Sequence, residues 1–278
     1  MSKMLGMVNT LDIEKTYPYL DGYIFGLKDF SINFLHTFSK EELESIYKKI
    51  KENGKEIYFA INKNLHNDEI KKLKEILLQI EKLNIDGIFY ADNAFITLKE
   101  ELKLKTKLIW YQEHLSTSYS SINTYYELGI KSATISNDIT LHEVKEIIKN
   151  TKSELYYMVF GYLPMFVSER NQIKNYEKYF NIKESTEYNY FICEGKKYPI
   201  IDNHLGTMAF SFNPICAYQE YLQMKDDLYA IILSDLFIKQ EKKKKIIQKF
   251  KEQNEIDINS LIETSSHFLY QDAIYKIK

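Results

Sequence analysis

Short apolar runs alternate with helix-forming segments along most of this 278-residue chain. Eight of the runs have the length of strands and are rich in Ile, Phe, Tyr and Val. They span residues 5–8, 22–26, 56–62, 87–92, 107–111, 132–137, 154–161 and 228–233. Continuous apolar strands separated by helices are typical of a parallel sheet that is buried on both faces. The alternation predicts an α/β fold, a (β/α)8 TIM-like barrel that is regular or distorted, with an open doubly wound sheet as the alternative.

The segments between the strands carry the start and stop signals of helices. Residues 39–54 begin at Ser39, a preferred N-cap residue, and end at Gly54. Thr140 is followed by Glu143 three residues later, which is the pattern of a capping box. Neither a GxGxxG fingerprint nor a P-loop motif follows any predicted strand, which argues against a nucleotide-binding open sheet.

Two regions depart from the alternation. Residues from about 186 to 213 contain extended segments around two turns, and they predict a small β-rich insertion before the last βα unit. Residues from about 236 to 278 predict a charged C-terminal helix and a tail. Because no linker or tandem repeat interrupts the alternation, we expect a single barrel domain over residues 1–278.

Charge and cysteine content exclude several classes of function. A net charge of −2 provides no overall basic field for nucleic acid, so an RNA partner would need a local patch such as the lysines at 242–245. The chain has two cysteines, Cys193 and Cys216, whereas iron–sulfur clusters typically take about four thiolates. We therefore expect no such cluster, no other cofactor and no metal site. A signal-peptide pattern and an apolar run of about 18 residues are both missing, so we expect a cytoplasmic protein with no membrane partner.

Polar side chains that follow the strands are candidates for a site, because active sites of parallel barrels collect at the C-terminal ends of the strands. Glu113 follows the fifth strand near Trp110, and a carboxyl group among aromatic rings is suited to general acid or base catalysis. The alternative is that Glu113 caps the next helix. Cys216 begins a predicted helix, whose dipole would stabilise a thiolate. The alternative for Cys216 is a small buried apolar residue.

Residues 156–180 end an apolar strand at Gly161 and continue through Pro164 to a loop that contains Ser168 and Arg170. This stretch resembles the signature of peptidase family U32, the collagenase-like peptidases, in which a strand is followed by Met-Phe and Ser-x-Arg. The resemblance extends over residues from about 5 to 274, and the chain looks most like the shorter branch of the family, which is linked to tRNA hydroxylation. Further matching positions are Asn62, His66, Asn67, Asp92, Trp110, Glu113, Thr117, Tyr198, Pro199, Asp202, Gly206, Thr207, Asn213 and Cys216.

The resemblance implies Glu113, Arg170 and Cys216 as catalytic residues. Arg170 would offer a planar, two-pronged donor to a carboxylate or a phosphate. The substrate-binding positions that the resemblance implies are Asn62, His66, Asp92, Trp110, Ser168 and Asp202. The chain departs from the family pattern at Phe160, where the signature has His, and at Pro164, where it has Cys.

Three functions are compatible with these residues. The first, implied by the branch, is hydroxylation of a tRNA wobble uridine, with a small carboxylate such as prephenate as a participant. The second is proteolysis, which the family name implies. The third is a non-catalytic scaffold that pairs with a paralogous family member, because the departures at Phe160 and Pro164 remove reactive side chains. Whether the chain is an enzyme is left open at this point.

Overall fold

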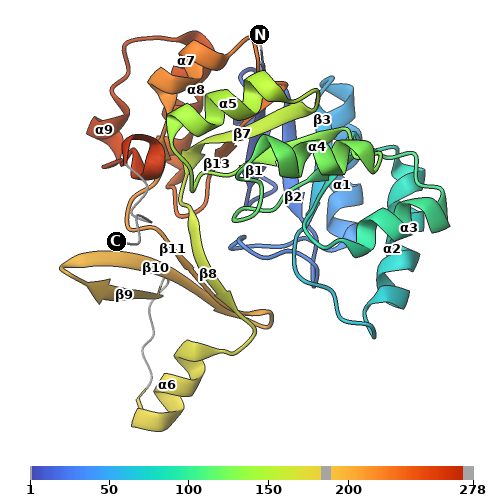
Figure 1. Cartoon of the computed structure of the whole chain (residues 1–278). Coiled ribbons are helices and arrows are strands. Elements are labelled where there is room, and N and C mark those ends of the chain that lie inside the picture. The colour runs from blue at the N-terminus through green and yellow to red at the C-terminus, as the bar shows by residue number, and fades with distance from the viewer. Residues whose placement is uncertain (1, 183–188, 272–278) are drawn as a thin grey trace, which may run out of the picture.

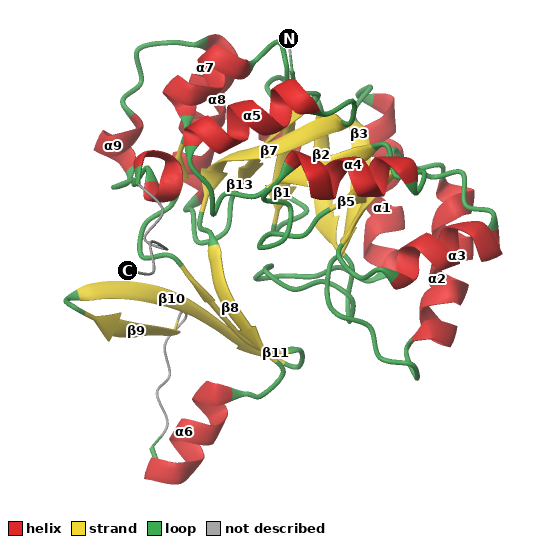
Figure 2. Cartoon of the chain, in the orientation of Figure 1, coloured by secondary structure: helices red, strands yellow, loops and turns green. Residues whose placement is uncertain are grey.

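The predicted parallel strands close into a TIM barrel in the computed structural model, which describes residues 2–182 and 189–271 (Figures 1 and 2). Its eight parallel strands are β1 (Lys3–Val8), β2 (Gly22–Gly26), β3 (Glu56–Ile61), β4 (Gly87–Tyr90), β5 (Leu108–Trp110), β6 (Ser132–Ile135), β7 (Glu154–Gly161) and β13 (Ala230–Ser234). Strands β1 to β7 pair in sequence order, and β13 pairs with both β7 and β1, which closes the ring. The open doubly wound alternative is therefore wrong.

Helices follow most of the strands and cover the outside of the barrel (Figure 2). They are α1 (Lys40–Glu52), α2 (Ile70–Leu83), α3 (Ala94–Leu102), α4 (Tyr119–Glu127), α5 (Leu141–Asn150), α7 (Tyr218–Met224), α8 (Gln240–Glu252) and α9 (Ile258–Leu261). The 3-10 helices are η1 (Glu14–Thr16), between β1 and β2, and η2 (His267–Tyr270). None of the helices in residues 2–182 and 189–271 is both long and apolar enough to cross a membrane.

The predicted caps hold two of these helices in place. The Ser39 hydroxyl accepts a hydrogen bond from the backbone N–H of Glu42, whose carboxylate accepts one from the Ser39 N–H in return. Thr140 and Glu143 form the same reciprocal pair at the start of α5. Both capping boxes satisfy N–H groups that a helix start otherwise leaves without partners. They fix the points at which the chain turns from the loops above the barrel into the outer layer.

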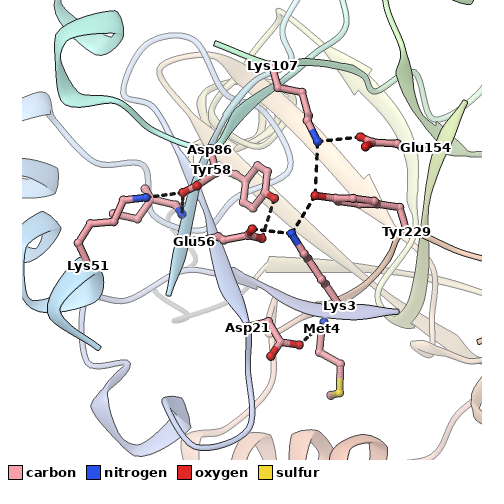
Figure 3. A network of polar contacts seen from close by, with 11 residues as sticks. Lys3, Met4, Asp21, Lys51, Glu56, Tyr58, Asp86, Lys107, Glu154 and Tyr229 are labelled. Atoms are coloured by element: carbon pink, nitrogen blue, oxygen red, sulfur yellow. Dashed lines mark hydrogen bonds and ion pairs between the residues drawn. The ribbon is translucent and has the colours of Figure 1, made fainter. Parts of the chain in front are cut away.

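Charged side chains of alternating sign close the N-terminal end of the barrel (Figure 3). The ammonium group of Lys3 lies 2.6 Å from a carboxylate oxygen of Glu56, and Lys107 lies 2.7 Å from Glu154. Both ammonium groups also lie over the ring of Tyr229, at 4.7 and 4.5 Å from its centre. In a TIM barrel one layer of side chains comes from alternate strands, and these residues come from the starts of β1, β3, β5 and β7. This end of the barrel is filled, which leaves the C-terminal ends of the strands as the place for a site.

A second, antiparallel sheet is inserted between β7 and β13. It consists of β8 (Pro164–Ser168), β9 (Asn189–Cys193), β10 (Lys196–Asn203) and β11 (Gly206–Phe210) in the order β8-β11-β10-β9, and it carries α6 (Gln172–Phe180). We call residues 164–182 and 189–210 the arm, which extends beyond the C-terminal ends of the barrel strands (Figure 1). The predicted β-rich insertion is confirmed for residues 189–210. Its first residues, 186–188, and the end of the predicted tail, 272–278, lie outside the described residues.

The sequence prediction of a loop at residues 164–171 is wrong in its first part, because residues 164–168 form β8. A proline cannot donate a backbone hydrogen bond to a neighbouring strand, so the sequence indicates a loop at Pro164. It is tolerated here because it is the first residue of a strand at the edge of the sheet. Gly161 makes the sharp exit from β7, as predicted, with a φ of +146°. A Cβ atom at that position would lie 2.6 Å from the Cβ of Ser234, so a larger residue would not fit without displacing β13.

After the arm, the short strand β12 (Ile215–Cys216) pairs antiparallel with the end of β7. The chain then enters α7 and returns to the barrel as β13. The hydrophobic core of the barrel is continuous from β1 to α8, and a smaller cluster around Met208 and Phe210 joins the arm to the loop after β13. The arm is thus fixed to the rim by its own apolar contacts.

Candidate active site

The C-terminal ends of β5 and β6 bring together the polar side chains with the most unusual surroundings. Glu113 follows β5, and Asp138 follows β6. The hydroxyl of Ser136 donates a 2.5 Å hydrogen bond to the Glu113 carbonyl and accepts one of 3.0 Å from the Asp138 N–H. These two bonds tie the ends of neighbouring strands to one another and fix the spacing of the two acidic residues.

The Glu113 carboxylate accepts hydrogen bonds from two other parts of the rim. The hydroxyl of Tyr111 donates to it at 2.6 Å, and the side-chain amide of Asn33 donates to its two oxygens at 3.1 and 3.0 Å. Asn33 belongs to the loop between β2 and α1, and its backbone N–H lies 3.2 Å from the sulfur of Met208 in the arm. Glu113 is therefore held by groups from β5, from the loop after β2 and, through Asn33, from the arm.

Burial raises the pKa of Glu113 above its usual value, although the hydrogen bonds from Tyr111 and Asn33 act in the opposite direction. Burial also keeps the pKa of the Tyr111 hydroxyl well above its ordinary value, so that this group stays a proton donor. A carboxyl group that holds its proton more readily than usual is suited to act as a general acid, or as a base of increased strength.

A second ionisable pair lies beside Glu113. The Nδ1 atom of His114 is 2.5 Å from a carboxylate oxygen of Asp138. The hydrogen bond to Asp138 raises the pKa of His114 above its ordinary value, and burial opposes this only in part. A histidine held by a carboxylate in this way has a fixed ring orientation and a stabilised positive charge. The rim thus places a proton donor next to a carboxyl group of raised pKa.

Two cavities meet at this pair. The smaller, about 20 Å³, is lined by Glu113, Tyr111 and Met158 among others. The larger, which we call the cleft, has a volume of about 820 Å³. Residues common to both are His114, Asp138, Leu163 and Pro164. A volume of this size is typical of small-molecule sites, and it is enough for a nucleoside.

Part of the wall of the cleft is aromatic. Tyr198 of β10, Phe212 and Phe268 line it, together with His267. The Nε2 atom of His267 lies 2.8 Å from the carbonyl oxygen of Asn213, and burial lowers the pKa of this histidine. The cleft therefore contains two histidines whose pKa values are shifted in opposite directions.

We expect the pair of His114 and Asp138 to contribute stability that depends on pH. Because the folded-state pKa of His114 is raised, its contribution is complete below the unfolded value of about 6.5 and is lost as the pH rises through the folded value. The melting temperature of His114→Gln should therefore fall below that of the unchanged protein at pH 5.5 and approach it at pH 9. Thermal melts at both pH values measure this. An equal difference at the two pH values would contradict a charged histidine at this position.

Two of the three predicted catalytic residues lie away from these cavities. Arg170 follows β8 in the arm, is exposed, and lines neither cavity. Cys216 lines a separate cavity of about 380 Å³ with Lys249 and Asp257. Burial raises the pKa of the Cys216 thiol to about 11, so the stabilising effect of the following N–H of Tyr218 does not prevail. The structure thus does not bring Glu113 and Cys216 to one cavity, and the thiol is mostly protonated at neutral pH.

Several predicted substrate-binding residues are occupied by local structure. The Asn62 side chain exchanges two hydrogen bonds with the backbone of Ile32, at 3.0 and 3.2 Å. Asp92 accepts hydrogen bonds from the N–H groups of Leu65 and Ala94. These contacts hold rim loops in position, so binding roles for Asn62 and Asp92 stay predictions.

The remaining predicted substrate-binding residues also make contacts within the fold. Trp110 is buried and stacks on Tyr125 with 3.8 Å between ring centres, on the outer side of β5. Asp202 accepts hydrogen bonds from the N–H groups at the start of α6, and the hydroxyl of Ser168 accepts one from the N–H of Arg170. The ring of exposed His66 lies 2.8 Å from Glu169. This last contact joins the loop after β3 to the arm.

The lysine run at 242–245 does not form a uniform basic face. Lys243 is buried in an ion pair with Asp235, which directly follows β13. Lys242 donates to the carbonyl of Leu261, and the ammonium group of Lys244 lies 5.9 Å from the centre of the Tyr19 ring. Much of the predicted basic patch is thus used within the fold, which weakens the case for RNA contact at α8.

Sequence reasoning missed Asn33 and the pairing of His114 with Asp138. Asn33 lies in a loop without a recognisable motif, and its left-handed φ of 66° is the only unusual feature of its backbone. His114 and Asp138 are 24 positions apart and meet because β5 and β6 are neighbours in the barrel. The sequence places His114 and Asp138 after neighbouring predicted strands, which indicates that both lie at the rim. That the two side chains pair follows only from the order of the strands in the barrel.

Comparisons with known proteins agree with this fold. The family model described as "Peptidase family U32" matches residues 19–255. A curated relative, "tRNA hydroxylation protein P2" of Bacillus subtilis (strain 168), is 26% identical over 212 residues, which cover 73% of this chain and 69% of the relative. "Uncharacterized protease MJ0090" of Methanocaldococcus jannaschii is 28% identical over 188 residues, 63% of this chain and 44% of that protein. The solved U32 peptidase Mk0906 superposes with a TM-score of 0.54 at 11% identity, over 84% of this chain and 92% of that one.

Proposed function

This chain belongs to peptidase family U32, and on that premise we propose that it takes part in the hydroxylation of tRNA at a wobble uridine. The observation that carries the proposal is the pair of joined cavities at the barrel rim. One of them contains Glu113, and the other is an aromatic cleft large enough for a nucleoside. A curated relative named for tRNA hydroxylation supports the same assignment.

The cleft has the chemistry expected of a site for an unpaired base. Proteins recognise single-stranded RNA by stacking bases on aromatic rings and by hydrogen bonds to the base edges. Tyr198, Phe212 and Phe268 offer rings, while His114 and Asp138 offer a donor and an acceptor at the junction with the smaller cavity. A uridine in the cleft would contact this junction, and a water molecule in the smaller cavity would connect it to Glu113.

The ionisable groups at the junction would move protons rather than electrons. Glu113 would act as general acid or base on the pyrimidine, and His114, held by Asp138, would stabilise negative charge on a base oxygen. Hydroxylation replaces a C–H bond by C–OH, which is a two-electron oxidation, and none of these side chains is such an oxidant. The oxygen atom and the oxidising equivalents would therefore come from a separate two-electron oxygen donor. We propose the small carboxylate as a further participant and not as the oxidant. Exposed Arg170 lies in the arm, 2 residues after β8. Its guanidinium group would bind the small carboxylate from the side of the arm.

We expect deletion of the gene to remove one hydroxyl group from a wobble uridine, seen as a loss of 16 mass units in a tRNA nucleoside, roughly the mass of one oxygen atom. Mass spectrometry of nucleosides from purified tRNA of the deletion strain and its parent measures this. Complementation with the intact gene is the control, and it should restore the hydroxylated nucleoside. A nucleoside profile identical to that of the parent would overturn the proposed function.

Proteolysis is the second candidate, because the family description and one relative carry the word protease or peptidase. It would need a nucleophile, and Cys216 is the thiol that the family resemblance supplies. Since the pKa of Cys216 is about 11 and its cavity is separate from the cleft, the site favours the first candidate. Peptide cleavage by the purified protein that disappears in Cys216→Ala would reverse this preference.

A further inference from the structure

We propose that one face of the arm sheet, together with Phe212 just after β11, is a stacking track that leads single-stranded RNA into the cleft. The track consists of Phe191 and Tyr198 on the sheet and of Phe212, with Lys196 beside them. The proposal rests on the proposed function, which it extends from the modified nucleoside to the nucleotides that flank it. It assigns an RNA-binding role to the arm rather than to the lysine run of α8.

The rings of the track form a continuous series that ends in the cleft. Phe191 and Tyr198 are stacked, with 4.7 Å between ring centres and planes only 6° apart. Tyr198 meets Phe212 edge to face at 5.7 Å, and Phe212 lies 6.0 Å from the ring of His267. Tyr198, Phe212 and His267 all line the cleft, whereas Phe191 lies on β9 at the outer edge of the arm. The series therefore connects the edge of the arm to the cleft, which His114 also lines.

The pairing of the strands decides which face of the arm carries this series. Tyr198 is directly opposite Phe191 in the ladder, so their side chains point to the same face. Ile201 and its partner Met208 have the opposite parity, and both are buried in the contact of the arm with the loop after β13. One face of the sheet thus anchors the arm, and the other presents partly exposed rings.

Charge on the same face favours nucleic acid as the occupant. The ammonium group of exposed Lys196 lies 4.2 Å from the centre of the Phe212 ring, so a positive charge sits beside the rings. Glu194, in the turn between β9 and β10, is the acidic residue nearest in sequence. Stacking rings with adjacent cations are the combination by which proteins hold single-stranded nucleic acid. If this face bound a protein instead of RNA, the series of rings would have no reason to end at an acid–base site.

Neighbouring residues on β9 and β10 provide matched controls. Tyr190 precedes Phe191 on the same strand and points to the opposite face, where the ammonium group of Lys197 lies 4.7 Å from its ring centre. Exposed Tyr190 is therefore a control for Phe191, and exposed Lys197 is a control for its neighbours Lys196 and Tyr198.

The test is the affinity of the full-length protein for an anticodon stem-loop RNA, labelled with a fluorophore and titrated at several salt concentrations. We expect Phe191→Ala and Tyr198→Ala each to weaken binding about tenfold, since stacking contributes roughly 1–3 kcal/mol per base. Tyr190→Ala should bind like the unchanged protein. Lys196→Gln should lower the slope of log affinity against log salt by about one phosphate contact, and Lys197→Gln should not.

Thermal melts accompany every variant, and Phe191→Leu and Tyr198→Leu replace any alanine variant that fails to fold. Unchanged RNA affinity in the track variants, or equal losses in Tyr190→Ala, overturns the track. If affinity is unchanged but Phe191→Ala abolishes co-purification of a second protein, the face binds protein and the proposal is wrong. A deletion strain that loses the hydroxylated nucleoside while track variants bind RNA normally refutes the track alone. A protein that binds no RNA refutes the track whatever the deletion strain shows.

Discussion

We expect the replacement of Glu113 by glutamine to lower the rate of the proposed tRNA hydroxylation by about 10²–10⁴-fold, the range that general acid–base groups contribute. Glutamine keeps the size of the side chain, and an amide oxygen at the position of Oε1 can still accept hydrogen bonds from Tyr111 and Asn33. The change therefore removes the ionisable group and the second oxygen that Asn33 contacts. Nucleoside mass spectrometry of tRNA from a strain that carries Glu113→Gln measures the loss.

The stability of the same variant separates a chemical role from a structural one. Because burial raises the pKa of Glu113, the ionised carboxylate costs stability once the pH exceeds the unfolded value of about 4.3. Glu113→Gln should therefore melt at or above the temperature of the unchanged protein at pH 7, and this advantage should vanish at pH 4. Glu75→Gln, an exposed glutamate on α2, is the matched control and should change neither activity nor melting. Full hydroxylation in a strain with Glu113→Gln would favour the non-catalytic scaffold that pairs with a paralogue.

Replacing Lys243 by methionine lowers the free energy of unfolding by about 3–5 kcal/mol, the typical cost of removing one partner of a buried ion pair. The side chains of Lys243 and Asp235 are 3% and 8% exposed, so Asp235 would be left as a buried charge. Hydrogen bonds from the N–H and the side-chain amide of Asn9, at 3.0 and 2.7 Å, would compensate for only part of the loss. The expected fall in melting temperature is on the order of 10 °C for a chain of this size.

Lys245→Met is the control for this variant, because Lys245 is exposed on the same helix and in the same run of lysines. It should melt within about 2 °C of the unchanged protein, as exposed substitutions rarely change stability much. Thermal melts followed by circular dichroism measure both variants. Equal melting temperatures for the two would show that the run acts as a solvated helix face, as its sequence alone suggests.

The barrel could be predicted from the sequence because its cause is repeated in every unit. Strands such as residues 22–26 and 154–161 are buried on both faces, so their apolar runs are uninterrupted, and the predicted bounds match those of β2 and β7. The N-cap at Ser39 and the capping box at Thr140 depend on neighbouring residues, so they could also be predicted from the sequence. Strand β8 was not, because Pro164 signals a loop unless the strand is known to be at a sheet edge.

The site was only partly predictable, for a reason that concerns distance along the chain. Glu113 could be placed at the rim because it follows a strand directly. Its contact with Asn33 spans 80 positions, and it depends on the path of a loop that no periodicity describes. For Cys216, the sequence indicated both a nearby helix start and burial as a small apolar residue, and the structure shows that burial dominates its pKa. Sequence patterns do not predict side-chain contacts between residues that lie far apart in the chain.

The layer of lysines and glutamates that fills the N-terminal end of the barrel has a consequence for experiments at the other end. Burial acts to lower the pKa of Lys3 and of Lys107, but hydrogen bonds and charge contacts with Glu56 and Glu154, respectively, and with Tyr229 prevail and raise both. The stability that these lysines contribute is complete below the unfolded value of about 10.4 and is lost only at higher pH. Between about pH 6 and pH 9 these two lysines therefore keep their charge and their contacts. A pH–rate profile measured over that window does not include their titration.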